Sequence, residues 1–114
     1  MKFEELRKYL LSKKGAEETF PFGEDTFVYK AGNKIFAITS FGLPLSVNLK
    51  CDPERAMELR EQYEEVQPGY HMNKKHWNTV VIDGSISTPV IKEMIDDSYD
   101  LIVQSLPKKL REEL

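Results

Sequence analysis

The chain has 114 residues, of which 40% are hydrophobic and 31% are charged, and its formal net charge is −3 at pH 7. This composition excludes a disordered chain, and the acidic total excludes a polycation that coats nucleic acid with its whole surface. A local basic face is compatible with this total, because affinity for phosphate depends on the patch and not on the net charge. The length predicts a single domain over residues 1–114.

The sequence carries no signal for secretion or for membrane insertion. No apolar run reaches the length of a membrane span, and the N-terminal stretch MKFEELRKYL lacks the apolar core of a signal peptide. Cys51 is the only cysteine, so an intrachain disulfide is excluded. We therefore expect a cytoplasmic protein without a membrane partner.

Three segments are predicted to be helices. The first covers residues 2–14, the second opens at Asp52-Pro53-Glu54, and the third begins at Thr88-Pro89 and stops before Pro107. Their apolar stripes are expected to be Phe3, Leu6 and Leu10; Ala56, Leu59 and Tyr63; and Ile91, Met94, Ile95, Ser98 and Ile102. The second helix is expected to expose a charged outer face of Glu54, Arg55, Glu58, Arg60, Glu61 and Glu64.

The strands are predicted from β-branched and aromatic runs. Residues 26–31 and 34–39 are expected to form a hairpin, with Gly32-Asn33 as a type II′ turn. Residues 45–50 and 77–82 are expected to form two further strands. The resulting order α-β-β-β-α-β(β)-α predicts a two-layer α+β fold, in which helices cover one face of an antiparallel sheet.

The segment 17–23 is predicted to be a connector, because Pro21 cannot lie inside a helix. Phe20 and Phe22 flank this proline, and large aromatic side chains are usually well buried. We expect both rings to plug one end of the core, the alternative being an exposed docking surface.

The densest stretch is residues 68–82, PGYHMNKKHWNTVVI, where aromatics, histidines and lysines precede a β-branched strand. With this stretch in view, the chain resembles the MmcQ/YjbR family of small bacterial proteins over nearly its whole length. The resemblance is carried by Phe20-Pro21-Phe22-Gly23, Tyr29-Lys30 with Gly32 and Lys34, Leu49-Lys50-Cys51-Asp52-Pro53, Leu59-Arg60, Pro68-Gly69-Tyr70-His71-Met72-Asn73-Lys74-Lys75-His76-Trp77, and Asp97-Ser98-Tyr99-Asp100-Leu101. Asn33 departs from the pattern where a second glycine is expected, but asparagine tolerates positive φ.

The resemblance implies a two-layer α+β fold, described as CyaY-like or double-wing. It also implies a DNA-binding label, which derives from similarity of that fold to a phage transcription-factor domain. A fold does not by itself establish a function. The resemblance implies no enzyme activity and no cofactor.

Nucleic-acid binding is the first functional hypothesis. Lysines would contact phosphates, histidine and asparagine would add hydrogen bonds, and an aromatic ring could stack on an unpaired base, worth roughly 1–3 kcal/mol. The residues expected to take part are Lys30, Lys34, Lys50, Tyr70, His71, Asn73, Lys74, Lys75, His76 and Trp77. The lysines beyond the central segment would join only if their strands present one wet face. The competing interpretation is that Tyr70 and Trp77 belong to the core and that the lysines solvate a turn.

The alternative is a protein- or peptide-binding adaptor that uses the open sheet face or an edge strand. Its exposed candidates are Tyr29, Phe41, Tyr70 and Trp77. In either case we expect a monomer.

Catalysis and metal binding are not expected. The sequence contains no nucleophile elbow, P-loop or dinucleotide fingerprint. His71 and His76 are five positions apart, which places them on different faces of a helix or of a strand, so no metal is expected. Cys51 lies beside a predicted helix N-terminus that could activate a thiol, but we expect an inert, partly buried side chain.

Overall fold

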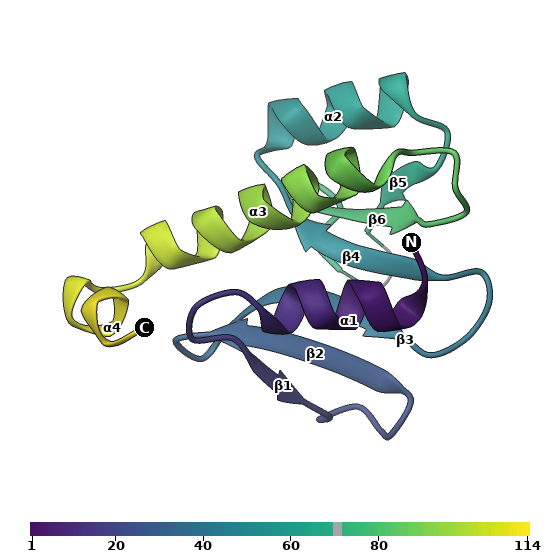
Figure 1. The fold of residues 1–114 in the computed structure, drawn as a ribbon. Coiled ribbons are helices and arrows are strands. Elements are labelled where there is room, and N and C mark those ends of the chain that lie inside the picture. The colour runs from purple at the N-terminus through teal and green to yellow at the C-terminus, as the bar shows by residue number, and fades with distance from the viewer. Residues whose placement is uncertain (70–71) are drawn as a thin grey trace.

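The structure is a computed structural model that describes residues 1–69 and 72–114. The described residues form a six-stranded antiparallel sheet in the order β1-β2-β3-β4-β6-β5 (Figure 1). The strands are β1 (Glu17–Thr19), β2 (Thr26–Ala31), β3 (Lys34–Ser40), β4 (Ser46–Lys50), β5 (Val66–Pro68) and β6 (Trp77–Val81). The helices are α1 (Phe3–Leu11), α2 (Pro53–Gln62), α3 (Thr88–Ser105) and α4 (Lys108–Glu113). The predicted α+β class and antiparallel sheet are confirmed.

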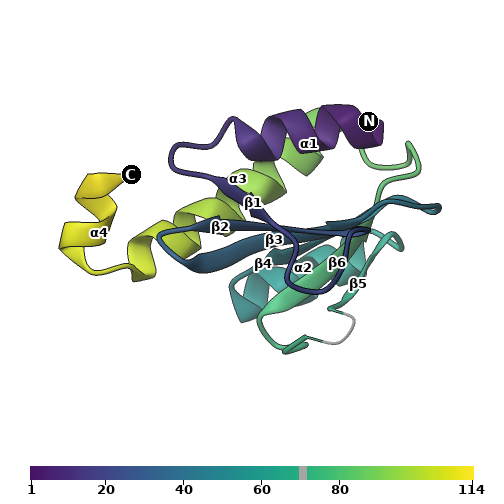
Figure 2. The same ribbon diagram turned by 90° about the horizontal axis from the view of Figure 1, so that it is seen from below.

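One face of the sheet carries the core. Figure 2 shows α1 and α3 on the same side of the strands. Helix α2 joins them there, because its Leu59 lines one small cavity together with Leu49 and Val80 of the sheet and Met94 of α3. The predicted helical stripes are buried at Leu6, Leu10, Ala56, Leu59, Ile91, Met94, Ile95, Ser98 and Ile102. In the described part of the chain, no helix covers the opposite face, which we term the open face.

The β2–β3 hairpin differs from its prediction at the turn. Gly32 and Asn33 both have positive φ, 55° and 68°, which is the type I′ pattern and not type II′. Type I′ is favoured here because asparagine accepts the second left-handed position. The hairpin also contains a bulge, since Tyr29 pairs with Ala37 while Lys30 pairs with Ile35. Phe36 is the extra residue, and it is buried in the core together with Ala37.

The prediction of a connector over residues 17–23 was wrong at its start. Residues Glu17–Thr19 form β1, which pairs with β2 at the edge of the sheet. The strand is held by side chains that the local pattern does not reveal. Glu18 accepts two hydrogen bonds from the Arg7 guanidinium, both 2.8 Å, and one of 2.7 Å from the Tyr29 hydroxyl. A three-residue strand therefore depends on a contact with α1.

Both phenylalanines of the segment 20–23 are exposed, so the expectation that they plug the core was wrong. Phe22 is 68% exposed, and Gly23 turns the chain with a φ of 119°. Phe20 is 47% exposed and makes an edge-to-face contact with the ring of Phe27, with the ring centroids 5.0 Å apart. Their exposure is what the alternative, an exposed docking surface, requires, and docking itself stays a prediction.

Several predicted boundaries shift. Helix α1 ends at Leu11 and not at residue 14, while α3 stops before Pro107 as predicted. The residues that follow Pro107 form the short helix α4. The predicted order placed an optional strand after residues 77–82, but the additional strand, β5, precedes β6. Among the described residues, the structure contains no helix with both the length and the hydropathy that a membrane span requires.

Candidate nucleic-acid interface

Three predicted site residues lie at the same end of the open face. Lys30 of β2, Lys50 of β4 and Trp77 of β6 each alternate with buried neighbours that point to the helices. Lys50 is the direct register partner of Trp77. Since adjacent strands lie about 4.8 Å apart, the backbones of Lys30 and Lys50 are separated by about 10 Å across the sheet. We term Lys30, Lys50 and Trp77 the open-face row.

The loop before β6 adds two exposed lysines beside this row. Lys74 and Lys75 are exposed, as is Asn73. The Asn73 side chain accepts a hydrogen bond from the Lys75 N–H at 2.9 Å, and its carbonyl accepts one from the Trp77 N–H at 2.9 Å. Asn73 therefore shapes the turn that presents the lysines. The predicted site residues Tyr70 and His71 lie outside the described residues.

Lys34 does not belong to the row. Its ammonium group donates hydrogen bonds to the hydroxyl and the carbonyl of Ser105, at 3.2 and 3.5 Å, so the side chain points to the end of α3. The prediction required the lysines to share one solvent-exposed face of the sheet. Lys30 and Lys50 do so, and Lys34 does not. Glu17 of β1 is the register partner of Lys30, so a carboxylate stands beside that lysine. The positive charge of the site is consequently concentrated at Lys50, Lys74 and Lys75.

His76 is half-buried, and its backbone has a structural task. Its carbonyl accepts a hydrogen bond of 2.7 Å from the Cys51 N–H, which ties the loop to the end of β4. Of the two histidines that a metal site would need, His71 lies outside the described residues. Within the described residues, no three His, Cys, Asp or Glu side chains are grouped to hold a metal ion.

Arg60 positions the loop, although the sequence placed it on the solvated face of the second helix. Its guanidinium donates to the Asn78 side chain at 2.7 Å, to the Trp77 carbonyl at 3.3 Å, and to the Lys74 carbonyl. A planar guanidinium supplies several donors in a fixed fork, which suits three acceptors on one loop. A sequence signal existed, because Arg60 lies four residues after Ala56 and therefore on the buried stripe of α2.

Ser98 of α3 holds the end of β4 from the helix-covered face of the sheet. Its hydroxyl donates to the Phe36 carbonyl at 2.6 Å and accepts from the Lys50 N–H at 2.9 Å. Phe36 is the bulged residue, so the regular β3–β4 ladder ends at this point. The buried hydroxyl bridges the two strands there and holds the backbone of Lys50 in place.

Cys51 lies at the junction of β4 and α2, at one end of a cavity of about 290 Å³ that Asp97 and Asp100 of α3 also line. The thiol is 8% exposed, and burial, followed by the charge of Asp97, raises its pKa to about 11. Burial and the neighbouring Glu93 carboxylate also raise the pKa of Asp97. These surroundings therefore disfavour a thiolate. The side chain is buried more fully than the partly buried cysteine that the sequence predicted, and its inertness stays a prediction.

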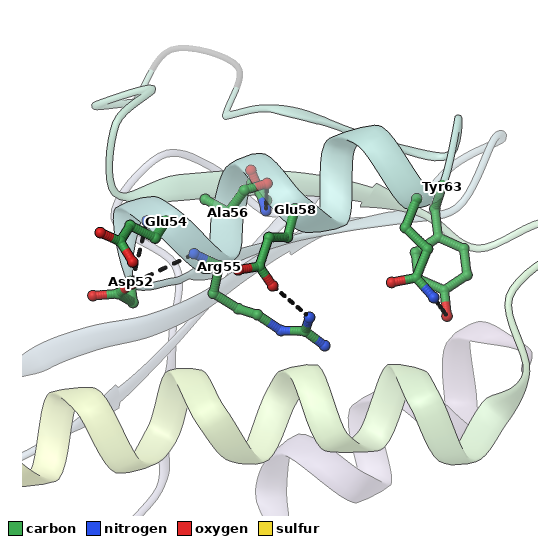
Figure 3. A network of polar contacts seen from close by, with 8 residues as sticks. Asp52, Glu54, Arg55, Ala56, Glu58 and Tyr63 are labelled. Atoms are coloured by element: carbon green, nitrogen blue, oxygen red, sulfur yellow. Dashed lines mark hydrogen bonds and ion pairs between the residues drawn. The ribbon is translucent and has the colours of Figure 1, made fainter.

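The N-terminus of α2 is capped beside this cavity (Figure 3). The Asp52 carboxylate accepts hydrogen bonds from the N–H groups of Glu54 and Arg55, as predicted. Arg55 extends from α2 toward α3, and its guanidinium contacts Glu58 at 3.2 Å (Figure 3). The charge of this arginine lowers the pKa of both Asp97 and the Cys51 thiol, but burial outweighs it at each group.

Comparison with known proteins identifies the family of the chain. The profile of the YjbR family matches residues 11–101, a range that contains Lys50, Arg60, Trp77 and Ser98. The chain belongs to the YjbR family.

Relatives with similar sequences support this assignment. The Escherichia coli O157:H7 protein YbdF is 41% identical over 95 residues, which cover 82% of this chain and 77% of YbdF. The YjbR protein of Escherichia coli K12 is 36% identical over 112 residues, which cover 97% of this chain and 95% of that protein. Both carry the description "uncharacterized protein", so they support the family assignment but indicate no activity.

Solved structures share the fold. The crystal structure of the Deinococcus radiodurans protein DR2400, a DUF419 domain, matches with a TM-score of 0.90 and 38% identity, over 96% of this chain and 85% of that one. A crystal structure of a Pseudomonas syringae protein matches with a TM-score of 0.79 and 26% identity, over 90% of this chain and 99% of that one. The arrangement of sheet and helices is therefore found in experimental structures of other bacterial proteins.

Proposed function

We propose that this YjbR-family protein binds nucleic acid as a non-enzymatic module, and that its ligand is a single strand laid across the open-face row. The observation that carries the proposal is the pairing of Lys50 with Trp77 on a sheet face that no described helix covers. Exposed Lys74 and Lys75 lie in the loop that leads into Trp77. A lysine beside an aromatic ring is the combination that single-strand binders use, with phosphates on the cations and a base on the ring.

The shape of the site favours a single strand over a duplex. Readout of the major groove requires an element that enters the groove, such as a helix or a two-stranded ribbon. The open face is a sheet surface, and the row lies on it with Trp77 half-buried. The faces of paired bases are occupied by their neighbours in the stack, whereas an unpaired base can lie against the indole ring.

The test uses Trp77 as its own reporter, because it is the only tryptophan of the chain. Indole fluorescence is followed during titration with an oligothymidine of about 12 nucleotides and with a duplex of similar length. We expect quenching by the single strand that is strong at about 20 mM salt and much weaker at about 150 mM, since phosphate contacts release counterions. The duplex should produce less quenching at the same concentration.

A matched pair of variants locates the contacts. Lys74→Ala/Lys75→Ala removes two charges from the loop, and we expect the salt slope for the single strand to fall by about 1.4. Lys8→Ala/Lys14→Ala removes the same charge from exposed positions on and just after α1, on the helix side of the sheet, and should leave binding unchanged. Equal binding by the two double variants, or no response to either ligand at low salt, would refute the proposal.

A further inference from the structure

An apolar surface lies at the end of the sheet opposite the open-face row. Two loops form it, residues 20–25 before β2 and residues 41–45 after β3. The loops are joined by a hydrogen bond of 2.9 Å from the Phe41 N–H to the Asp25 carbonyl. Because β2 begins and β3 ends here, this surface is separated from the β2–β3 turn by the full length of both strands (Figure 1).

A row of four aromatic rings forms the floor of this surface. Phe20, Phe27, Phe3 and Phe41 contact one another edge to face in that order, with centroid distances of 5.0, 5.0 and 5.3 Å. Phe3 and Phe27 pack against the core, which fixes the row. Edge-to-face packing gives the exposed rings a defined position instead of a free rotation.

Large apolar side chains project from both loops. Phe22 is 68% exposed, Phe41 is 67% exposed and Leu43 is 96% exposed. Beside them lies a groove of about 430 Å³, lined by Met1, Phe3, Phe41, Leu43, Leu45 and Ile82. Contiguous exposed apolar groups next to a groove are typical of interaction sites in soluble proteins. We term the two loops and this groove the phenylalanine end.

The charges around the phenylalanine end are mostly acidic. Glu24 and Asp25 follow Phe22, Glu4 follows Phe3, and Asp83 follows Ile82. Asp83 accepts a hydrogen bond of 2.9 Å from the Ser85 N–H, which lowers the pKa of its carboxyl group and keeps it ionised. Lys2 is the cationic side chain among the residues that line the groove.

The acidic charges distinguish between the partners that could bind the phenylalanine end. A second copy of the chain would place acidic rims against each other across a two-fold axis, and an anionic membrane would meet the same repulsion. A cationic partner with apolar anchors would be attracted by the rim and would fill the groove. We propose that the phenylalanine end docks an amphipathic, lysine- or arginine-rich peptide segment of another protein, with apolar side chains in the groove and cations on Glu24 and Asp25.

This docking surface lies at a different place from the open face that the sequence suggested for a protein-binding adaptor. Of the expected contact residues, Tyr29 is fully buried and donates its hydroxyl hydrogen bond to Glu18, so it cannot take part. Phe41 is exposed as expected, but it belongs to the phenylalanine end and not to the open face. The inference does not depend on nucleic-acid binding, because the two surfaces share no residue.

The test is an amide chemical-shift titration of the full chain with a designed peptide. The probe is a helical peptide of about 18 residues made of leucine and lysine, with the leucines on one face. A peptide with glutamate in place of lysine and a scrambled leucine–lysine peptide serve as controls. We expect shifts at residues 20–25 and 41–45 with the first peptide, and no saturable shifts there with either control.

Substitutions of exposed side chains complete the test without disturbing the core. Leu43→Ser and Phe22→Ser should each weaken binding of the leucine–lysine peptide about tenfold, since each removes one large apolar anchor. Met57→Ser removes a side chain on α2 that is 61% exposed, and should have no effect. Glu24→Gln/Asp25→Asn should weaken binding at low salt more than at high salt.

Four results would overturn the inference. The first is shifts that lie outside the two loops, and the second is equal binding of the glutamate peptide. The third is a dimer in sedimentation that Leu43→Ser dissociates, because a second copy would then be the occupant. The fourth is binding of the parent, but not of Leu43→Ser, to vesicles of anionic lipid.

Discussion

Replacing Ser98 by alanine tests how the sheet is held together next to the candidate site. The Ser98 hydroxyl is fully buried and bridges the Phe36 carbonyl and the Lys50 N–H. Its position coincides with the bulge, where Phe36 lacks a register partner on β2 and the β3–β4 pairing stops. Alanine would remove the bridge and leave both backbone groups in the interior without that partner.

The expected loss of stability follows from these two groups. A buried polar group that loses its hydrogen bond costs about 1–3 kcal/mol, so the substitution should lower the free energy of unfolding by about 3 kcal/mol. For a domain of about 100 residues this corresponds to a fall in melting temperature of roughly 12 °C. A change of this size is a large part of the about 5–15 kcal/mol that stabilises a typical domain.

Urea unfolding, followed by Trp77 fluorescence and by far-ultraviolet circular dichroism, measures the effect. We expect a lower midpoint with an unchanged slope, since the same surface is exposed on unfolding. Ser12→Ala is the matched control, because the Ser12 hydroxyl bonds the Tyr9 carbonyl at the exposed end of α1. A loss below about 0.5 kcal/mol for Ser98→Ala would refute the reasoning, because β3 and β4 would then close the gap without the hydroxyl.

Three further predictions concern Arg60, Cys51 and Glu18. Arg60→Lys should lower the free energy of unfolding in urea by about 1–3 kcal/mol and weaken single-strand binding. The reason is that one ammonium group cannot donate to the Asn78 side chain and to the loop carbonyls together. Unchanged binding would show that Arg60 does not support the site. Cys51, with a pKa of about 11, should react with iodoacetamide far more slowly at neutral pH than free cysteine does, as mass spectrometry would record. The Arg7 guanidinium lowers the pKa of Glu18 below its ordinary value of 4.5, so Glu18→Gln should be less stable than the parent at neutral pH. That difference should shrink as the pH falls through the lowered pKa, and a constant difference in acid would contradict the assignment.

The fold was predictable to the extent that it rests on local chemistry. Helix α2 begins after Asp52 because an aspartate cap and a proline define its first turn in any context. The stripe of α3, from Ile91 to Ile102, is readable because helical spacing brings these residues to one face. Strand β1 was missed because three residues carry little periodicity, and because the bond that holds them joins Glu18 to Arg7 on a different element, eleven positions away.

The candidate site was predictable in composition but not in arrangement. The dense segment before β6 pointed to Lys74, Lys75 and Trp77 as neighbours along the chain. Only the sheet register shows that Lys50 stands beside Trp77, and only the end of α3 explains why Lys34 turns away. The opposite apolar end depends in the same way on loops that lie far apart in sequence.

The sequence by itself determined the capped start of α2, the apolar stripe of α3, the hairpin, the antiparallel α+β class and the family, because each follows from spacing or from motifs along the chain. The predicted cap of α3 was wrong, since Thr88 lies inside the helix and its N-cap Ser87 makes no side-chain cap bond. The tertiary structure decided which lysines share a face, that Arg60 holds a loop instead of meeting solvent, and that Phe20 and Phe22 lie on the surface. These outcomes depend on which elements meet in space. A side chain's partners are fixed by packing and register, and neither is contained in its neighbours along the chain.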